Sequence, residues 1–333
     1  MANSLVYVSD QDPGIRRKRA GRGFSYVGPD GRCLTGAARR RVEKLGVPPA
    51  YSDVWICLTE DGHLQATGRD ARGRKQYRYH PDWQSAQAST KYAGLITFAM
   101  ALPALRARLT RDLRHAPGGR DFTVAALVLL LDRSFLRIGN PEYAVQNASF
   151  GATTLLRRHV RIGKDRVHLD FTAKGGKRLR QVLRDQKLHR VLQTVGDLPG
   201  RQLFTYVDAD GAPRPVTSGE VNDWLATVMG EGVTAKAFRT WGGTLAAYTY
   251  AETLPPETRL TVKAMAQAAS DVLHNTPAIC RSSYVHPAVL ELAALEPAER
   301  QRTLATVLPT GLRGLRADEQ RLLSFLQSTE KNR

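Results

Sequence analysis

The period of the hydrophobic pattern changes once along the chain, at Asp82. Before this residue, short alternating segments are separated by turns rich in Gly, Pro and Asp, a pattern typical of antiparallel strands. After it, apolar residues recur with the period of an α-helix over most of the remaining length. We therefore expect an α+β fold with two domains, a small antiparallel β-sheet domain over 1–81 and a larger, mainly α-helical domain over 82–333.

The N-terminal domain is expected to be a meander of short strands. Residues 1–13 are polar and are predicted to be mobile. The basic run at 16–22 fits either a solvated tail or an arm that contacts phosphates. Strands are predicted at 24–27, 54–58, 64–67 and 75–80, and a short helix at 37–45.

The second domain is expected to contain a central helix and a small sheet. Residues 123–136 are apolar enough for a core helix, with Gly139 as its left-handed cap. Pro103 is expected to interrupt the long helical region before it. A small hairpin sheet is predicted over 160–183, and further helices are predicted at 186–195, 218–229, 235–251 and 256–273.

Positive charge is spread along the whole chain. Lysine and arginine number 49 against 31 aspartate and glutamate, which gives a formal charge of +18 at pH 7. This excess favours a polyanionic partner, most simply nucleic acid. A ribosome-associated protein, or one that is simply rich in arginine, would carry the same charge, so charge alone does not define the function.

Several kinds of site have no counterpart in the sequence. The three cysteines, Cys33, Cys57 and Cys280, are widely separated, and no histidine has metal-site spacing, so we expect neither disulfides nor a metal. The nucleotide-binding glycine motifs are absent, so no ATP, dinucleotide or other cofactor is expected. No signal-peptide core and no stretch of about 18 apolar residues occurs. We expect a cytoplasmic protein with no membrane association.

The strand predicted at 75–80 has no apolar face. Alternation places Gln76, Arg78 and His80 on one side and Lys75, Tyr77 and Tyr79 on the other. Such a strand suits a surface that lies against DNA, where glutamine reads base edges and basic side chains hold phosphates. A plain edge strand is the alternative.

Tyr284 becomes a candidate nucleophile only in combination with basic residues upstream. It ends the run Thr276-Pro277-Ala278-Ile279-Cys280-Arg281-Ser282-Ser283-Tyr284. Transfer of a phosphodiester to tyrosine requires that a phenol with a pKa of about 10 be drawn toward phenolate. Arginine forks suit the non-bridging oxygens, and lysine suits proton donation to the departing sugar oxygen. We therefore expect two arginines and one lysine near Tyr284.

Three basic residues have suitable sequence contexts. Arg137 follows the apolar helix between Leu136 and Ile138, so its charge is expected to be partly buried. Lys174 precedes two glycines at the tip of a predicted hairpin, where the main chain can approach a ligand. Arg239 lies near the start of a helix, the end that favours anions. None of the three is specific by itself.

Together these residues resemble the motifs of type IB DNA topoisomerases of the short poxviral and bacterial kind. The strand Gln76-Tyr77-Arg78-Tyr79 is similar to the DNA-contacting strand of that family's N-terminal domain. The other matching motifs are Leu136-Arg137-Ile138-Gly139, Phe171-x-x-Lys174-Gly175, Lys236-x-x-Arg239-Thr240-Trp241, and Thr276-Pro277 leading to Arg281-x-x-Tyr284.

The resemblance implies a function and a partner. Tyr284 would attack a backbone phosphate, form a 3′-phosphotyrosyl bond and release a 5′-hydroxyl, assisted by Arg137, Arg239 and Lys174. Resealing would need neither ATP nor metal, because the covalent link retains the phosphodiester energy. The implied partner is double-stranded DNA of the nucleoid, clamped by a monomer. The implied DNA contacts are Gln76, Tyr77, Arg78, Tyr79, Tyr143 and Lys236.

One position departs from the common family pattern, which has histidine nine residues before the nucleophile. Here that residue is Asn275. Asparagine can donate a hydrogen bond to a non-bridging oxygen but cannot act as a cation or a general acid. His274 is adjacent, yet one step along a helix turns a side chain by about 100°. We therefore expect Asn275 to be the residue that contributes.

Two other functions stay open from the sequence. A tyrosine recombinase shares the arginine, lysine and tyrosine chemistry, but its helix usually carries His-x-x-Arg where this chain has Lys236-x-x-Arg239, and its N-terminal domain is helical. A non-catalytic nucleic-acid-binding protein would fit the charge equally well.

Overall fold

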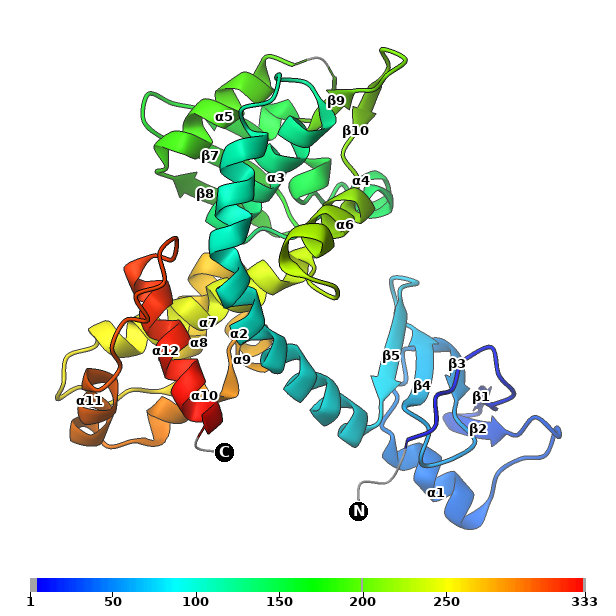
Figure 1. Ribbon diagram of the computed structural model, residues 1–333. Coiled ribbons are helices and arrows are strands. Elements are labelled where there is room, and N and C mark those ends of the chain that lie inside the picture. Colours follow the sequence, from blue (N-terminus) through cyan, green and yellow to red (C-terminus); the bar gives the residue numbers. More distant parts are fainter. Residues whose placement is uncertain (1–4, 199, 332–333) are drawn as a thin grey trace. The chain divides into compact units, whose positions relative to one another are not determined.

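The structure, a computed structural model, describes residues 5–198 and 200–331, and no side chain at 85–91, 93, 143 or 331. The chain divides into two compact units, Met1–Lys91 and Tyr92–Arg333. Figure 1 shows a sheet in the first unit and mostly helices in the second. The α+β fold class predicted from the sequence is confirmed. None of the helices in the described ranges combines the length and apolarity needed to cross a membrane.

Five antiparallel strands form the sheet of the first unit, in the order β2-β1-β3-β4-β5. Helix α1 contributes Val42 to a core that it shares with Ile15, Val54 and Ile56 of the sheet. Strand β5 lies at one edge. The elements are β1 (Ile15–Ala20), β2 (Gly23–Val27), α1 (Gly36–Lys44), β3 (Ser52–Ile56), β4 (Leu64–Arg69) and β5 (Lys75–Tyr79).

The basic run at 16–22 is part of the sheet, because β1 pairs with both β2 and β3. Ile15 is buried beneath it. The Arg17 guanidinium donates hydrogen bonds of 2.9, 3.0 and 2.6 Å to the main-chain oxygens of Val47, Pro48 and Tyr51. Before β1, the main chain of Val6 is hydrogen-bonded to the turn at 61–63. The basic run is therefore part of a strand and not a solvated tail, whereas the alternative that its exposed side chains contact phosphates stays a prediction.

Helices dominate the second unit, and two small sheets interrupt them. Within this unit, Figure 1 shows α12 beside α7, which also packs against α8 and α10, while α5 packs against α3. The helices are α2 (Pro81–Asp112, which begins in the first unit), α3 (Arg120–Ser134), α4 (Pro141–Asn147), α5 (Gln186–Gly196), α6 (Ser218–Met229), α7 (Ala235–Thr253), α8 (Val262–Leu273), α9 (Pro277–Ser283), α10 (Pro287–Glu291), α11 (Pro297–Ala305) and α12 (Ala317–Lys331). The remaining elements are the strands β6 (Val160–Ile162), β7 (Val167–Thr172), β8 (Arg178–Leu183), β9 (Thr205–Val207) and β10 (Pro213–Pro215) and the short turns η1 (Ala152–Thr154), η2 (Arg157–His159) and η3 (Leu292–Ala294).

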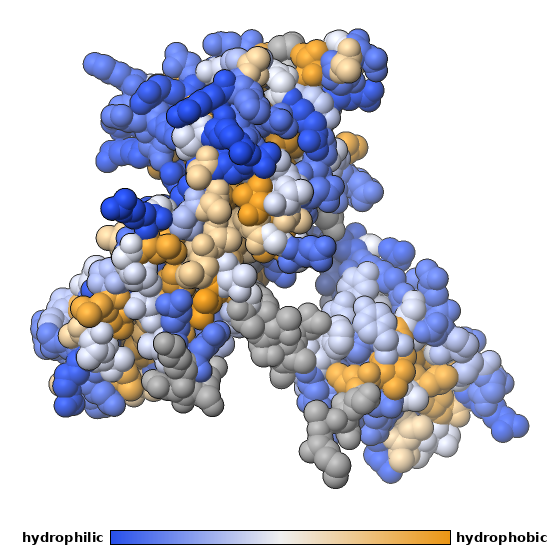
Figure 2. Space-filling model, in the orientation of Figure 1, coloured by the Kyte–Doolittle hydropathy of each residue, from blue (hydrophilic) through white to orange (hydrophobic). Residues whose placement is uncertain are grey.

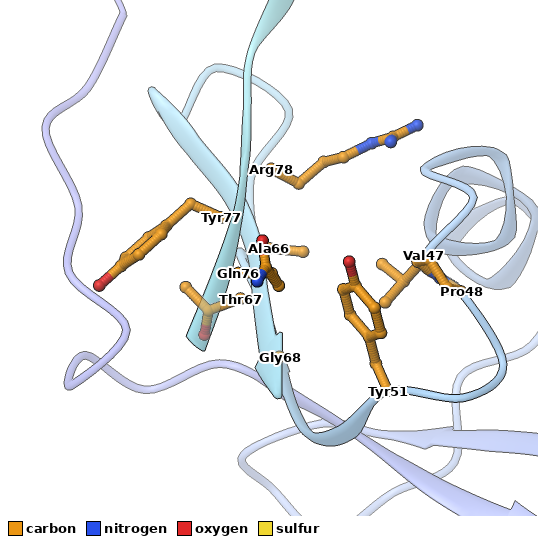
Figure 3. Close-up of a pocket in the computed structure, with 9 residues that line it drawn as sticks. All are labelled: Val47, Pro48, Tyr51, Ala66, Thr67, Gly68, Gln76, Tyr77 and Arg78. Carbon is orange, nitrogen blue, oxygen red and sulfur yellow. The ribbon is translucent and has the colours of Figure 1, made fainter. Parts of the chain in front are cut away.

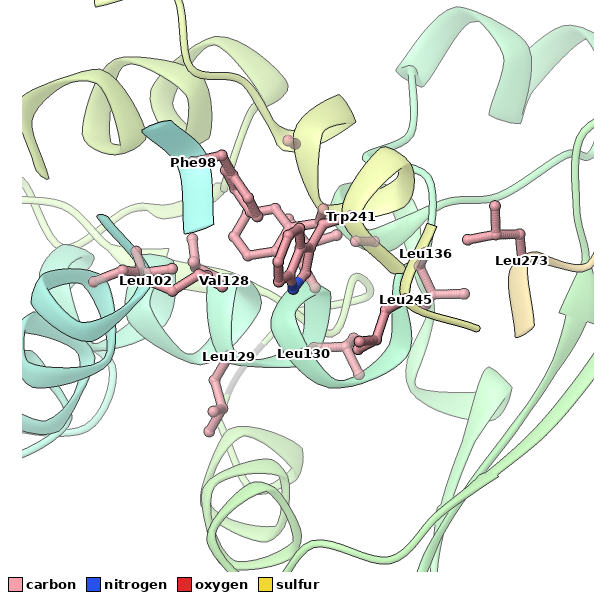
Figure 4. Packing of buried hydrophobic residues seen from close by; sticks show 14 of the residues in the cluster. Phe98, Leu102, Val128, Leu129, Leu130, Leu136, Trp241, Leu245 and Leu273 are labelled. Atoms are coloured by element: carbon pink, nitrogen blue, oxygen red, sulfur yellow. The ribbon is translucent and has the colours of Figure 1, made fainter. Parts of the chain in front are cut away.

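Helix α3 is the central helix predicted from the sequence, buried along nearly its whole length. Figure 4 shows Val128 and Leu130 of α3 packed among Phe98 of α2 and Trp241 and Leu245 of α7. Burial of each such side chain contributes about 1.5–3 kcal/mol relative to exposure. The C-terminal end of α3, which leads into Arg137, is consequently held by core packing.

Pro103 does not interrupt α2, which continues from Pro81 to Asp112. The predicted break is therefore wrong. Proline removes one main-chain donor from a helix, but tertiary packing can override that cost. Here the flanking residues Leu102 and Leu105 are fully buried in the core, and the Pro103 ring lies against Gly314 in the segment before α12.

The hairpin sheet predicted over 160–183 is present as β6-β7-β8. Its inner face buries Val167, Leu169 and Phe171, whereas its outer face exposes Arg178 and Arg180. Figure 2 shows a hydrophilic surface over α5, β7 and β8. The sheet therefore carries a basic outer surface on an apolar base.

Arg300 fixes the connection between α7 and α8. Its side chain is 1% exposed and donates to the main-chain oxygens of Thr258 at 2.7 Å and Pro255 at 2.9 Å. Arg300→Ala should lower the free energy of unfolding by about 3 kcal/mol in urea titration, because it removes a fully buried side chain together with its charged hydrogen bonds to the two carbonyls. The exposed neighbour variant Arg302→Ala should change it by less than about 0.5 kcal/mol. Equal losses in the two variants would contradict this role.

Candidate active site

Tyr284 lies directly after the short helix α9, and its N–H donates to the Cys280 oxygen at 2.9 Å. Helix α7 holds it from the other side. A Cβ at Gly243 would lie 2.8 Å from the main-chain oxygen of Tyr284, so the two main chains are in close contact. The Thr244 hydroxyl donates to the same oxygen at 3.2 Å. The candidate nucleophile is thus fixed through its main chain.

Arg239 is the buried cation beside this tyrosine. It is 4% exposed on α7, and its Nη1 and Nη2 atoms donate to the main-chain oxygens of Phe135 at 2.6 Å and Leu273 at 3.1 Å. Its Cζ atom lies over the Tyr284 ring, 5.0 Å from the ring centroid, and its Nε atom is buried without a hydrogen-bond partner among the described residues. Both carbonyls are neutral, so neither cancels the charge.

The two carbonyls that hold Arg239 come from helix ends with left-handed residues. Phe135 ends α3 with φ 52°, and His274 ends α8 with φ 52°, directly after Leu273. A bulky residue in this region is strained, and such strain often occurs at functional sites. Gly139 was predicted to cap α3 and does have φ 100°, but the cap is Phe135. The Phe135 ring packs against Gly242 of α7, which explains how a phenylalanine is accommodated there.

Arg137 and Asn275 form a pair next to Arg239. Arg137 is half-buried, as predicted, and its Nη2 donates to Oδ1 of Asn275. The Ser270 hydroxyl donates to the main-chain oxygen of Asn275 at 2.8 Å and fixes that residue. Nδ2 of Asn275 is buried and has no hydrogen-bond partner among the described residues. The pair therefore offers an available N–H donor beside two positive charges.

Neighbouring positive charges lower the pKa values of Tyr284 and Arg239. Burial alone would raise the pKa of the Tyr284 phenol, but the charge and hydrogen bond of Arg239, with the charges of Arg137 and Lys236, hold it below its ordinary value. Burial, and then the charge of Arg137, lowers the pKa of Arg239 as well. A buried cation, Arg239, beside a half-buried one, Arg137, favours a bound anion, and the oxygens of a phosphodiester suit arginine donors.

Neighbouring groups extend the site. Lys236 is exposed one turn before Arg239, close enough for its charge to act on Tyr284. Lys174 is exposed at the tip of the β7–β8 hairpin, where Gly175 and Gly176 have positive φ. Lys177 at the base of this tip lies near enough to Cys280 for its charge to act on the thiol. The proton-donor role of Lys174 stays a prediction.

His274, adjacent to Asn275, does not supply another cation. Burial first, and then the charge of Arg239, lowers the pKa of its imidazole. A histidine with a lowered pKa is neutral near pH 7. Among the described residues, no cluster of His, Cys, Asp or Glu side chains is suited to a metal ion.

The other predicted DNA contacts lie on β5 or outside the described side chains. Tyr77 is 52% exposed and stacks on Tyr79, with ring centroids 6.0 Å apart. Figure 3 shows Arg78 on the opposite side of β5, beside a pocket that Tyr51 and Gln76 also line. The predicted alternation is confirmed for these residues, although Tyr79 also packs on the core formed by Trp55, Cys57 and Leu64. Tyr143 belongs to α4, but its side chain lies outside the described part.

Comparison with known proteins decides the family. A family model for the catalytic core of eukaryotic DNA topoisomerase I matches residues 80–283, and one for the N-terminal domain of bacterial DNA topoisomerase IB matches residues 23–70. DNA topoisomerase 1B of Acanthamoeba polyphaga mimivirus is 31% identical over 299 residues, which cover 85% of this chain and 88% of that protein. The chain belongs to the type IB DNA topoisomerase family.

Poxviral relatives extend the match. DNA topoisomerase 1B of vaccinia virus (strain Copenhagen) and DNA topoisomerase I of monkeypox virus are each 20% identical to this topoisomerase over 255 residues, which cover 73% of this chain and 76% of theirs. The resemblance inferred from the motifs is therefore confirmed at the level of the family.

Some residues of the site were missed in the sequence. The carbonyls of Phe135 and Leu273 have no sequence signal, because every residue has a carbonyl. A signal did exist for the close contact with Tyr284. Two consecutive glycines, Gly242 and Gly243, stand inside a helical pattern, which often indicates a close main-chain approach.

Gly243→Ala tests the close contact with Tyr284. The added methyl group would lie 2.8 Å from the main-chain oxygen of Tyr284 and 3.1 Å from its Cβ, and should therefore push the whole residue, with its phenol, out of place. A shift of this kind should slow single-turnover DNA cleavage by at least about 10-fold. The matched variant Gly219→Ala in α6 places its methyl group 3.8 Å from its nearest neighbour and should cleave at the parent rate. Parent-rate cleavage by Gly243→Ala would contradict the packing constraint.

Proposed function

We propose that this topoisomerase relaxes supercoiled DNA by transferring one strand transiently to Tyr284. The carrying observation is that the buried Arg239 guanidinium lies over the Tyr284 ring, 5.0 Å from its centroid, while its Nη partners are neutral carbonyls. This arrangement combines an activated phenol with an unneutralised site for a phosphate.

The proposed cleavage step exchanges one ester bond for another. The phenol oxygen of Tyr284 gives its proton to solvent water and attacks the phosphorus, while the bond to the 5′-oxygen of the departing strand breaks. A 3′-phosphotyrosyl bond forms, and Lys174 gives a proton to the departing oxygen. In resealing, the 5′-hydroxyl attacks the same phosphorus and the phenol leaves. The ester energy is retained throughout, so the cycle consumes no nucleotide.

Arg137, Arg239 and Asn275 are proposed to stabilise the transition state. Charge develops on the two non-bridging oxygens, and arginine meets it without losing its proton. The available Nδ2 of Asn275 supplies a further donor. Since an amide does not titrate, Asn275 contributes a hydrogen bond but no proton.

We also propose that duplex DNA is contacted by both units of a monomer. Support comes from the net charge of +18 and from Lys75, Tyr77 and Arg78, which are exposed on an edge strand. The match of residues 23–70 to a bacterial N-terminal domain favours a bacterial enzyme, which would act on nucleoid DNA in the cytoplasm.

Tyr284→Phe tests the nucleophile, because it removes only the hydroxyl. Relaxation of negatively supercoiled plasmid and the denaturation-resistant protein–DNA adduct should both disappear, while DNA binding by gel shift should persist. The matched variant Tyr250→Phe removes a hydroxyl from a partly buried tyrosine of α7 and should stay active. An adduct that survives in Tyr284→Phe would assign the nucleophile to another residue.

Lys174→Ala tests the proton donor. Cleavage of an ordinary strand should slow by about 100- to 10,000-fold, the usual contribution of general acid catalysis. A strand whose bridging 5′-oxygen is sulfur should restore cleavage, because a thiolate leaves without a proton. Lys177→Ala, on the same hairpin, should show the same ratio to the parent on both substrates. Equal defects of Lys174→Ala on the two substrates would reduce Lys174 to a phosphate contact.

A further inference from the structure

A fully buried carboxylate lies on the C-terminal helix, outside the site described above. Glu319 of α12 is 0% exposed and accepts hydrogen bonds from three side chains. The donors are Arg106 at 2.7 and 2.8 Å, Arg316 at 2.8 Å and Nε1 of Trp241 at 3.3 Å. So many donors on one buried carboxylate keep it ionised and fix its position.

This carboxylate joins the helices that carry the two arginines of the site. Arg106 of α2 binds Glu319 with one set of N–H groups and Asp132 of α3 with another, at 2.9 and 3.1 Å. Asp132 lies one turn before the end of α3, shortly before Phe135 and Arg137. Trp241 lies two residues after Arg239 on α7. A continuous path therefore runs from α3 through Arg106 and Glu319 to α7.

The path runs parallel to the contact that anchors Arg239. Nη1 of Arg239 reaches from α7 to the Phe135 oxygen at the end of α3, a distance of 2.6 Å. The Asp132–Arg106–Glu319–Trp241 path bridges the same two helices nearby. A change in the spacing of α3 and α7 would disturb both, and hydrogen bonds weaken within a few tenths of an ångström.

The network stays charged under ordinary conditions. Burial would raise the pKa of Glu319, but the hydrogen bond and charge of Arg106, with the charge of Arg316, lower it to about 2. Burial would lower the pKa of Arg106, but its hydrogen bonds to Glu319 and Asp132 raise it above its ordinary value. A carboxyl with a depressed pKa contributes stability above its unfolded pKa, and this is lost only as the pH falls toward about 2.

We propose that Glu319 is a positioning residue for strand cleavage, which acts through Trp241 and Arg106 to hold Arg239 against the end of α3. The C-terminal helix is then part of the catalytic architecture through its contacts to α2 and α7. This rests on the proposed role of Arg239.

Glu319→Gln tests the proposal, because it keeps the size of the side chain and removes its charge. Single-turnover cleavage should slow by about 10- to 100-fold, the effect of a small misplacement at the reacting centre. The dissociation constant for duplex DNA should stay within about twofold, since phosphate contacts dominate binding. The indole ¹H–¹⁵N resonance of Trp241, assigned from Trp241→Phe, should shift.

Glu252→Gln is the matched control. Arg321 of α12 pairs with Glu252 of α7, so this contact also links the two helices, but at the end of α7 remote from Arg239. Glu252→Gln should cleave at the parent rate and leave the Trp241 resonance unmoved. Urea titration of both variants reports their stability. Equal slowing by both variants, in proportion to lost stability, would overturn the positioning role, as would parent-rate cleavage by Glu319→Gln.

Trp241→Phe provides a second test if Glu319→Gln folds poorly. It removes the N–H donor and retains an aromatic ring, and it should slow cleavage by a similar factor. In the double variant the two losses should not add, because both break one path. Additive losses would overturn the proposal. The parent enzyme distinguishes failure of the positioning role of Glu319 from failure of the proposed function. A parent that forms no covalent adduct with DNA would contradict the proposed function itself.

Discussion

The structure of the site depends on a buried guanidinium that is held by main-chain oxygens. Arg239 spans from the end of α3 to the end of α8, and these helix ends supply Phe135 and Leu273. A carboxylate in either place would have cancelled its charge. Carbonyls fix the side chain while its charge remains available to a phenol and a phosphate. The lowered pKa of Tyr284 follows from this choice of partners.

The candidate tyrosine and arginines could be predicted because their chemistry allows few residue types, whereas Asn275 was predicted only from the family resemblance. The structure brings Tyr284 next to Arg239 and pairs Arg137 with Asn275. The main-chain partners were not predictable, and Phe135 shows why. A left-handed helix end is normally assigned to glycine, which led to Gly139, whereas tertiary packing against Gly242 places a phenylalanine there. Lys174 was identified by its motif alone. Whether its amine can approach the departing 5′-oxygen depends on the position of the β7–β8 hairpin that carries it.

The fold shows a similar division. Elements with a strong period, such as α3 and α6, match their predicted ranges closely. The basic run at 16–22 had two open interpretations, and neither included a strand inside the sheet, although most of its charged residues are exposed as expected. The Arg17 guanidinium donates hydrogen bonds to three carbonyls within the first unit. Part of the net charge of +18 therefore stabilises the fold and is not available to bind DNA. The break predicted at Pro103 was wrong because the helix propensity of a residue contains no information about the tertiary packing of its neighbours.

Anchoring by main-chain atoms has a consequence for the recognition of such sites. At positions 135 and 273 the contact to the guanidinium depends on the backbone shape of the helix ends, because the carbonyl group that accepts the hydrogen bond is common to every residue type. Gly243 is constrained in the opposite sense, because it must lack a side chain. A search for active sites of this kind by residue identity will find the tyrosine and the arginines but not the two carbonyls, of Phe135 and Leu273, that hold Arg239. Comparison of backbone geometry at the two helix ends would reveal it.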